Sequence, residues 1–434
     1  MIEFLRQKQK KRMQQLEVLG NDYLKDTLLK KKEKNVFYGK NKIALGKIVL
    51  NNGELGETYY LDISQACRII KVGMTRGGKT FLMRAMGDRA YKAGHAVVYL
   101  TDVKDEFKSS RKPVQPEYYR FLDNYEKPQK TPVVTFRPTF FKKLREDLKE
   151  LPSQNYWYSP NIKVMRKADF VTLLSASKFP FRQQNTLEMV WSRMQKWLKE
   201  NKNNDVKFDF RLIEDWIEEV DDDENQSSSR SSLKMKLKPL YDSGFYEPNW
   251  ERDLVKMIRD KFVPSINMES YDEVGESRFK YPEVIISLAL SEIITARRNG
   301  KIPPVWFFMD EALRFVGEGE ETCVLDILSR SFDLDTRYNI NYDLAVQDIN
   351  KLPEKLINQA KYLMVTATAT IAEIQQCMKI CGIGSTPQAR MYRAHSIKTK
   401  LQKVKFSWAI FTREGEMHII KPLAPLSEHM ETSK

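Results

Sequence analysis

The chain has 434 residues, of which 41% are hydrophobic and 30% charged, and it carries a formal net charge of +14 at pH 7. This length supports two or three domains, and the apolar content is too high for a chain that is disordered throughout. It contains no apolar run of the roughly 18 residues that a spanning helix needs, no apolar signal-peptide core at its amino terminus, and too few cysteines for a disulfide scaffold. We therefore expect a cytoplasmic protein with no membrane span.

The excess positive charge is concentrated towards the two ends, in residues 1–34 and 389–434. Basic ends suit contact with a polyanion such as nucleic acid, because neutralised phosphates release counterions. Solvated tails without a ligand are the alternative interpretation, and charge runs alone do not separate the two.

The chain begins with a Lys-rich helical arm (1–34), which is followed by short extended pieces (35–66). Strands and helices then alternate regularly. The alternation begins the core segment 67–146, with predicted strands over 67–73, 95–103 and 131–139 and a helix over 80–94. Nearly continuous apolar strands that alternate with amphipathic helices are typical of a parallel sheet covered on both faces.

Polar helical patterns interrupt the alternation over residues 147–259, which we interpret as a helical insertion. The core resumes over residues 260–388, and residues 389–434 are expected to form a basic hairpin and tail. The predicted elements are helices over 185–201, 209–220 and 231–244, then a strand over 261–270, a helix over 281–300, strands over 305–309, 341–347 and 361–368, a helix over 370–382 and a hairpin over 405–415.

A phosphate-binding motif lies between the first predicted strand and the first core helix. Residues 73–80 read Gly-Met-Thr-Arg-Gly-Gly-Lys-Thr and fit G-x-x-x-x-G-K-[ST]. Its backbone amides would cradle phosphates, Lys79 would reach the β- and γ-phosphates, and the Thr80 hydroxyl would bind Mg²⁺. We therefore expect ATP and Mg²⁺ as cofactors. The expected nucleotide-binding residues are Gly73, Thr75, Arg76, Gly77, Gly78, Lys79, Thr80 and Phe81.

Acidic and amide side chains close two later strands of the predicted core. Asp310 and Glu311 follow strand 305–309, where Asp310 would hold Mg²⁺ directly or through water and Glu311 would act as general base. A strand that ends in two acidic residues by chance is the alternative, which the upstream phosphate-binding motif disfavours. Gln347 closes strand 341–347 and could report the state of the γ-phosphate, although an ordinary loop glutamine would look the same.

The ordered set of motifs resembles the HerA/FtsK superfamily of hexameric DNA-pumping ATPases. The segments that carry the resemblance are GMTRGGKT, TDVKDEF, INMES, WFFMDEALRFV, LSRSFDLDTRYNI and DLAVQD, over roughly residues 35–423. The resemblance implies an α/β fold: a RecA-like P-loop NTPase core with a parallel sheet, a helical insertion and a short N-terminal β region. It also implies that Lys79 and Thr80 bind nucleotide, that Asp310 and Glu311 hydrolyse it, that Gln347 is a sensor, and that Arg330 or Arg337 acts in trans.

By this resemblance the chain is an ATP-driven translocase that grips double-stranded DNA without reading its sequence, as a homohexameric ring. The resemblance also implies a role in DNA processing, packaging or transfer. Its partner would be a nuclease, or a capsid or portal protein. A packaging motor would act inside a virus-infected cell. Two positions depart from the family pattern, since Met74 and Arg76 stand where a small residue and a glycine are usual. The alternative function is a P-loop ATPase that moves or assembles protein.

Overall fold

The computed structural model describes most of the chain beyond residue 40. The described residues are 41–102, 106–123, 126–144, 154–174, 179–201, 206, 208–219, 227–269, 280–317 and 322–428. The predicted helical arm over residues 1–34 therefore lies outside the described residues. The chain divides into two compact units, Met1–Lys42 and Ile43–Lys434, and the description below concerns the second.

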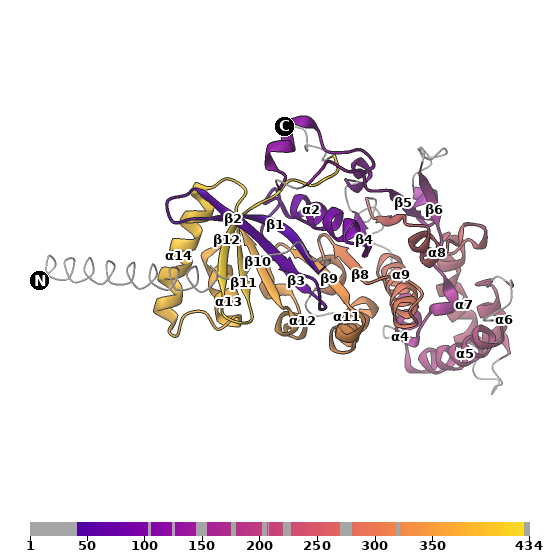
Figure 1. Ribbon diagram of the computed structural model, residues 1–434. Helices are drawn as coiled ribbons and strands as arrows, with labels where there is room; N and C mark the ends of the chain where they lie inside the picture. The colour runs from indigo at the N-terminus through magenta and orange to yellow at the C-terminus, as the bar shows by residue number, and fades with distance from the viewer. Residues whose placement is uncertain are drawn as a thin grey trace, which may run out of the picture. The chain divides into compact units, whose positions relative to one another are not determined.

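Among the described residues, twelve strands form one mixed sheet, in the order β2-β1-β12-β11-β10-β3-β9-β8-β4-β7-β5-β6 (Figure 1). The strands are β1 (Lys42–Val49), β2 (Leu55–Asp62), β3 (Arg68–Val72), β4 (Ala96–Asp102), β5 (Val133–Pro138), β6 (Asn155–Tyr158), β7 (Val263–Asn267), β8 (Val305–Met309), β9 (Ile340–Val346), β10 (Tyr362–Thr366), β11 (Trp408–Thr412) and β12 (Met417–Pro422). Every pair from β10 to β6 is parallel, whereas β10-β11, β11-β12 and β12-β1 are antiparallel.

The helices follow the strands in the alternation that the sequence predicts. They are α2 (Lys79–Lys92), α3 (Phe141–Leu144), α4 (Lys167–Leu174), α5 (Phe181–Glu200), α6 (Leu212–Glu218), α7 (Ser227–Asp242), α8 (Leu254–Arg259), α9 (Tyr281–Arg298), α10 (Leu313–Val316), α11 (Cys323–Leu334), α12 (Glu354–Gln359), α13 (Ile371–Ile380) and α14 (Pro387–Lys403). Figure 1 shows α4 to α7 grouped near the β5-β6 end of the sheet and α13 and α14 beside β10 to β12. The mostly parallel sheet with its helices confirms the predicted α/β fold class.

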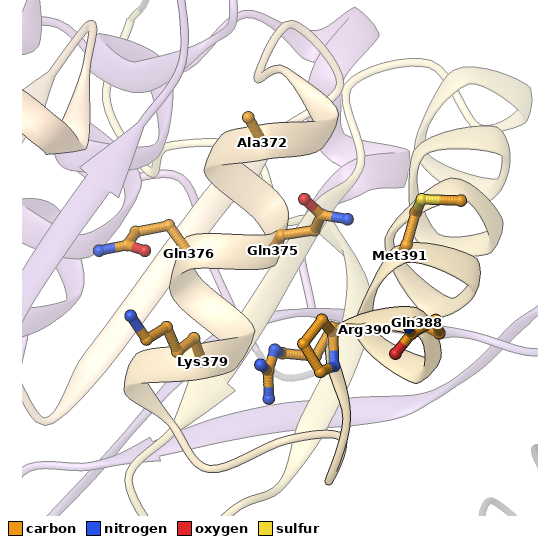
Figure 2. Close-up of a pocket in the computed structure, with 8 residues that line it drawn as sticks. Ala372, Gln375, Gln376, Lys379, Gln388, Arg390 and Met391 are labelled. Carbon is orange, nitrogen blue, oxygen red and sulfur yellow. The ribbon is translucent and has the colours of Figure 1, made fainter.

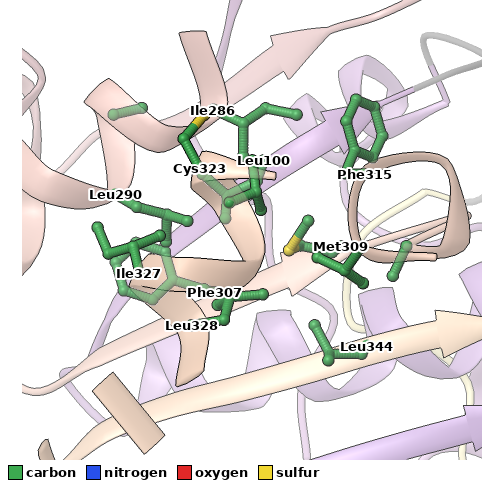
Figure 3. Packing of buried hydrophobic residues seen from close by; sticks show 14 of the residues in the cluster. Leu100, Ile286, Leu290, Phe307, Met309, Phe315, Cys323, Ile327, Leu328 and Leu344 are labelled. Atoms are coloured by element: carbon green, nitrogen blue, oxygen red, sulfur yellow. The ribbon is translucent and has the colours of Figure 1, made fainter. Parts of the chain in front are cut away.

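The central strands are buried on both faces, which explains their continuous apolar sequences. Helix α2 packs on one face, and α9 and α11 pack on the other. On the α9 face, strand residues Leu100, Phe307, Met309 and Leu344 pack against Ile286, Leu290, Ile327 and Leu328 (Figure 3). This layer holds β8 and β9 in place. Asp310 and Glu311 follow the carboxyl end of β8, and Gln347 follows that of β9.

Two elements lie where the sequence pattern indicated otherwise. Strand β6 falls inside the segment 147–259, which was expected to be helical, and pairs with β5 at the edge of the sheet. Helix α14 falls mostly inside the segment 389–434, which was expected to form a hairpin and tail. It buries only Ala394, Ile397 and Leu401, so its apolar periodicity is too weak to read from the sequence.

Helix α9 is largely buried and carries a carboxyl group in its apolar environment. Burial, with a smaller contribution from Asp253, raises the pKa of Glu292 to about 8, and one of its carboxylate oxygens has no hydrogen-bond partner among the described residues.

None of the helices in the described part of the chain is long and apolar enough to cross a membrane.

Candidate nucleotide-binding site

The phosphate-binding motif forms the tight connection between β3 and α2. Gly78 adopts φ 81° at the start of α2, a left-handed conformation that glycine reaches without strain. A side chain at position 77 would meet the hydroxyls of Thr366 and Thr368 at 2.9 and 2.8 Å, so only glycine fits there. The loop therefore packs its backbone closely against the end of β10 and leaves its outer side open.

Met74, Thr75 and Arg76 form the exposed side of this loop. Arg76 has φ 65°, a left-handed conformation that is uncommon for a residue with a Cβ atom. This conformation accounts for the glycine that the family usually has at this position. Arginine occupies it here at a conformational cost.

Lys79 and Thr80 begin α2 and turn towards the loop and towards β8, respectively. The Lys79 ammonium donates hydrogen bonds to the carbonyl oxygens of Gly73 and Met74 at 2.6 and 3.1 Å. The Thr80 hydroxyl donates to Oδ2 of Asp310 at 2.6 Å, across 230 residues of sequence. The two residues assigned to Mg²⁺ from the sequence are thus adjacent in the structure.

Asp310 is held by its neighbours as well as by Thr80. The Thr101 hydroxyl of β4 donates to the carbonyl oxygen of Asp310 at 2.6 Å, and the amide of Glu311 donates to Oδ1 of Asp310 at 2.9 Å. The end of β8 is therefore anchored to β4 on one side and to α2 on the other.

Glu311 has φ 48°, in the left-handed region, at the turn between β8 and α10. Its carboxylate oxygen Oε2 lies 2.6 Å from Nε of Arg314, one turn further along. Both side chains are partly exposed, at 20% and 29%. The spacing i, i+3 is the only indication of this ion pair in the sequence.

The end of β9 joins the phosphate-binding loop to the segment after β8. The carbonyl oxygen of Val346 accepts a hydrogen bond from the amide of Gly73 at 3.2 Å, and that of Ala345 accepts one from Ala312 at 2.9 Å. Gln347 follows directly and is exposed. Gln347 therefore follows the strand that lies between the loop strand β3 and the acidic strand β8.

A threonine pair at the end of β10 supports the loop and was missed from the sequence. The hydroxyl of Thr368 accepts a hydrogen bond from the amide of Met74 at 3.0 Å, and the hydroxyls of Thr366 and Thr368 are 2.6 Å apart. The only signal in the sequence is the short polar pattern Thr-Ala-Thr after an apolar strand.

A buried ion pair connects the strand that precedes the loop to the strand that precedes Gln347. Lys71 of β3 and Asp343 of β9 lie 2.5 Å apart, and both side chains are fully buried. Burial lowers the pKa of Lys71 and raises that of Asp343, and each partner's charge opposes the shift of the other. No local pattern in the sequence links these two residues, because they lie on different strands and 272 residues apart.

The remaining predicted residues lie away from these contacts within one chain. Phe81 packs against an apolar cluster that includes Val114 and Leu426. Arg330 is exposed on α11 and pairs with Asp326, four residues earlier. Arg337 is exposed before the first residue of β9. Because β3 and β9 are parallel, Arg337 lies at the opposite edge of the sheet from the loop.

The strand order defines the class of protein. The loop follows β3 and the acidic pair follows β8, and β9 lies between these two strands. A strand inserted between the loop strand and the acidic strand is the arrangement of RecA-like P-loop NTPases. The fold and the site therefore define a P-loop NTPase.

Comparison with known families then gives the family itself. Residues 45–280, more than half of the chain, match the family described as the central domain of the helicase HerA. The chain belongs to this family and is a HerA-type P-loop ATPase. No curated protein sequence is significantly similar to it.

The chain is similar to several solved structures at low sequence identity, and VirB4 shares its fold. VirB4 of Thermoanaerobacter pseudethanolicus is 12% identical, with a TM-score of 0.55 over 90% of this chain and 98% of its own. The genome packaging NTPase B204 of Sulfolobus turreted icosahedral virus 2, solved with ATP-γ-S, is 10% identical, with a TM-score of 0.33 over 82% and 98%. The type VII secretion ATPase EccC of Thermomonospora curvata, represented by its cytoplasmic domain, is 10% identical, with a TM-score of 0.33 over 93% and 30%.

Proposed function

We propose that this protein hydrolyses ATP to move double-stranded DNA through a ring of identical subunits. The observation that carries the proposal is the 2.6 Å contact between Thr80 and Asp310, with Glu311 next to it in the chain. The contact brings a hydroxyl and a carboxylate together at the mouth of the phosphate-binding loop, as nucleotide hydrolysis requires.

The residues present fit a magnesium nucleotide. Thr80 and Asp310 are hard oxygen ligands, which Mg²⁺ prefers, and the ion when bound would neutralise charge on the phosphates. The backbone amides of residues 75–80 would hold the phosphates. The Lys79 ammonium, which contacts carbonyl oxygens of the loop, would exchange these for phosphate oxygens.

Glu311 would act as the general base. It would accept a proton from the attacking water as the new bond to the γ-phosphorus forms and the bond to the ADP oxygen breaks. Arg314 would hold the carboxylate in one orientation through the 2.6 Å contact. Gln347, at the end of β9, would sense the γ-phosphate.

An arginine from a neighbouring subunit would complete the site, as Arg330 or Arg337. The position of Arg337 at the opposite sheet edge supports a role in trans, because it cannot serve the site of its own chain. Arg330 is exposed and also remains a candidate. Either assignment makes hydrolysis depend on the oligomer, which we propose to be a hexamer.

The test is ATP hydrolysis with and without duplex DNA of mixed sequence. A DNA translocase should hydrolyse ATP faster when duplex is present, and displacement of a triplex-forming strand from the duplex should require ATP. Hydrolysis that responds to neither duplex nor single strands would contradict the proposal. That result would favour the alternative, an ATPase that moves or assembles protein.

A further inference from the structure

A basic groove lies between α13 and α14, on the far side of β10 from the acidic pair. It has a volume of about 400 Å³, and its lining consists of cations, amides and small or apolar side chains, with no carboxylate. Figure 2 shows Gln375 directed from α13 towards Met391 of α14, with Arg390 between the two helices. The lining residues are Ala372, Gln375, Gln376, Lys379, Pro387, Gln388, Arg390 and Met391.

We infer that this groove and the exposed side of α14 bind the sugar-phosphate backbone of duplex DNA. The inference rests on the proposed function and adds a contact surface to it. Lysine and arginine neutralise phosphates, and glutamine amides donate hydrogen bonds to phosphate oxygens without reading bases.

The charge of the surrounding chain supports this occupant. Residues 374–413 contain eight Lys or Arg and no Asp or Glu. Lys379 and Lys403 are exposed, and neither forms an ion pair with any described residue. A surface without acidic residues repels cations and favours a polyanion over a neutral or basic partner.

Helix α14 buries one apolar side and exposes the opposite side. It buries Ala394, Ile397 and Leu401 against the rest of the protein. Met391 and Tyr392 are exposed at 44% and 39%, at the groove end of the helix. An exposed apolar and aromatic pair beside cations can pack on deoxyribose, which offers apolar carbon between phosphates.

The groove is connected to the phosphate-binding loop by a short series of contacts. The Lys398 ammonium of α14 donates to the carbonyl oxygens of Ala367 and Ala369, at 2.6 and 2.5 Å. Thr368 lies between these two alanines in the sequence, and its hydroxyl accepts a hydrogen bond from the amide of Met74 at 3.0 Å. Duplex bound along α14 would therefore act on the segment that supports the loop. Through this segment, bound duplex would increase the rate of ATP hydrolysis.

The test compares duplex binding by a groove variant and a matched control. The groove variant carries Lys379→Glu and Gln388→Glu. The control carries Lys301→Glu and Gln65→Glu, which change the net charge equally at exposed positions before β8 and β3. Affinity for a short fluorescein-labelled duplex is measured by anisotropy over a series of salt concentrations, and oligomer mass is measured by light scattering.

We expect the groove variant to weaken duplex binding about tenfold and to flatten the salt slope by about 0.9 for each phosphate that the variant no longer neutralises. The control should bind like the wild type. Equal binding by the groove variant and the wild type would overturn the inference and leave the proposed function intact. Weaker binding with a changed oligomer mass would overturn it in favour of a subunit interface.

A wild-type protein that binds no duplex would overturn the inference together with the proposed function. If it then binds polyglutamate at the same salt concentration, the groove is a site for an acidic protein segment.

Lys398→Met tests the connection separately. We expect this variant to bind duplex with wild-type affinity and to lose about fivefold or more of the stimulation of ATP hydrolysis by duplex. The ratio of stimulated to basal hydrolysis is the measured quantity, because general damage to the fold would lower both rates. An unchanged ratio would overturn the link between α14 and the loop.

Discussion

The carboxylate of Glu311 and the guanidinium of Arg314 lie 2.6 Å apart across the turn between β8 and α10. The same turn gives Glu311 its left-handed φ of 48°. A carboxylate that is both turned by its backbone and held by a cation has few orientations available. The pair therefore offers a direct test of the proposed role of Glu311 as general base.

Arg314→Gln should lower the rate of ATP hydrolysis about tenfold with little change in nucleotide affinity, because the base is still present but less well oriented. Steady-state kinetics that separate kcat from KM provide the measurement. Glu311→Gln and the double variant complete a cycle, in which Arg314→Gln should have no further effect once Glu311 is replaced. Additive effects in the cycle would mean that Arg314 acts independently of Glu311.

Lys79→Ala should abolish hydrolysis, because it removes the charge that would bind the β- and γ-phosphates. Glu311→Gln should instead retain nucleotide binding and lower kcat by about 10²- to 10⁴-fold. Binding of a fluorescent ATP analogue and release of phosphate distinguish the two variants. Wild-type hydrolysis by either one would remove that residue from the mechanism.

Arg76→Gly should leave the protein as stable as the wild type or stabilise it by about 1 kcal/mol, because glycine adopts φ 65° without strain. Arg76→Val should lower the melting temperature, since a β-branched residue does not fit this conformation. If the arginine contacts phosphate, Arg76→Gly will also weaken nucleotide binding despite its intact stability. Nucleotide affinity equal to that of the wild type would limit Arg76 to another role.

A subunit with Arg337→Ala mixed with a subunit with Lys79→Ala should recover part of the activity that each lacks alone. In the proposed ring, some interfaces of the mixed oligomer then contain an intact loop on one side and an intact arginine on the other. Hydrolysis is measured over a range of mixing ratios after mixed oligomers have been verified by native mass spectrometry. If no ratio restores activity, the same experiment with Arg330→Ala is the next test.

Stability should fall as the pH rises from about 4.5 to about 8, by up to a few kcal/mol from Glu292 alone. The pKa of Glu292 is raised in the folded state, so the folded protein holds a proton that the unfolded chain releases above its ordinary pKa of 4.5. Above pH 8 both states are ionised and the contribution becomes constant. Urea unfolding of Glu292→Gln over this range should show a flatter pH dependence.

The exposed residue Glu117 provides the matched control for that measurement. Glu117→Gln should leave the pH dependence of the wild type unchanged. Identical pH profiles for the wild type and Glu292→Gln would show that the carboxyl of Glu292 ionises equally in both states.

The core could be predicted from the sequence wherever one face or both faces of an element are strongly apolar. Strands β3, β4, β8 and β9 and helices α2 and α9 fall within their predicted ranges or within one residue of them. Strand β6 escaped prediction because it has only four residues, and α14 because three buried positions in a helix of 17 residues leave a weak pattern. Short and weakly buried elements depend on tertiary contacts, which are not visible in local sequence.

Prediction of the site had a similar limit. The loop is recognisable because a fixed spacing is tied to its chemistry, and Asp310 and Glu311 are recognisable because they directly follow a strand of apolar residues. Thr368 supports the loop through a contact across 294 residues of sequence, and no local spacing encodes such a contact. Arg314 could have been found by its spacing from Glu311, whereas Lys398 could not have been linked to the loop without the fold.

The buried pair of Lys71 and Asp343 also constrains how this chain can change over time. Loss of either partner alone leaves the other charge buried without a counter-charge, which lowers the free energy of unfolding by about 3 to 5 kcal/mol. Replacement of both by apolar residues is often tolerated. The two positions lie on neighbouring strands but 272 residues apart in the sequence. We therefore expect related chains to hold both charges or neither, so that β3 and β9 share a correlated mutational history.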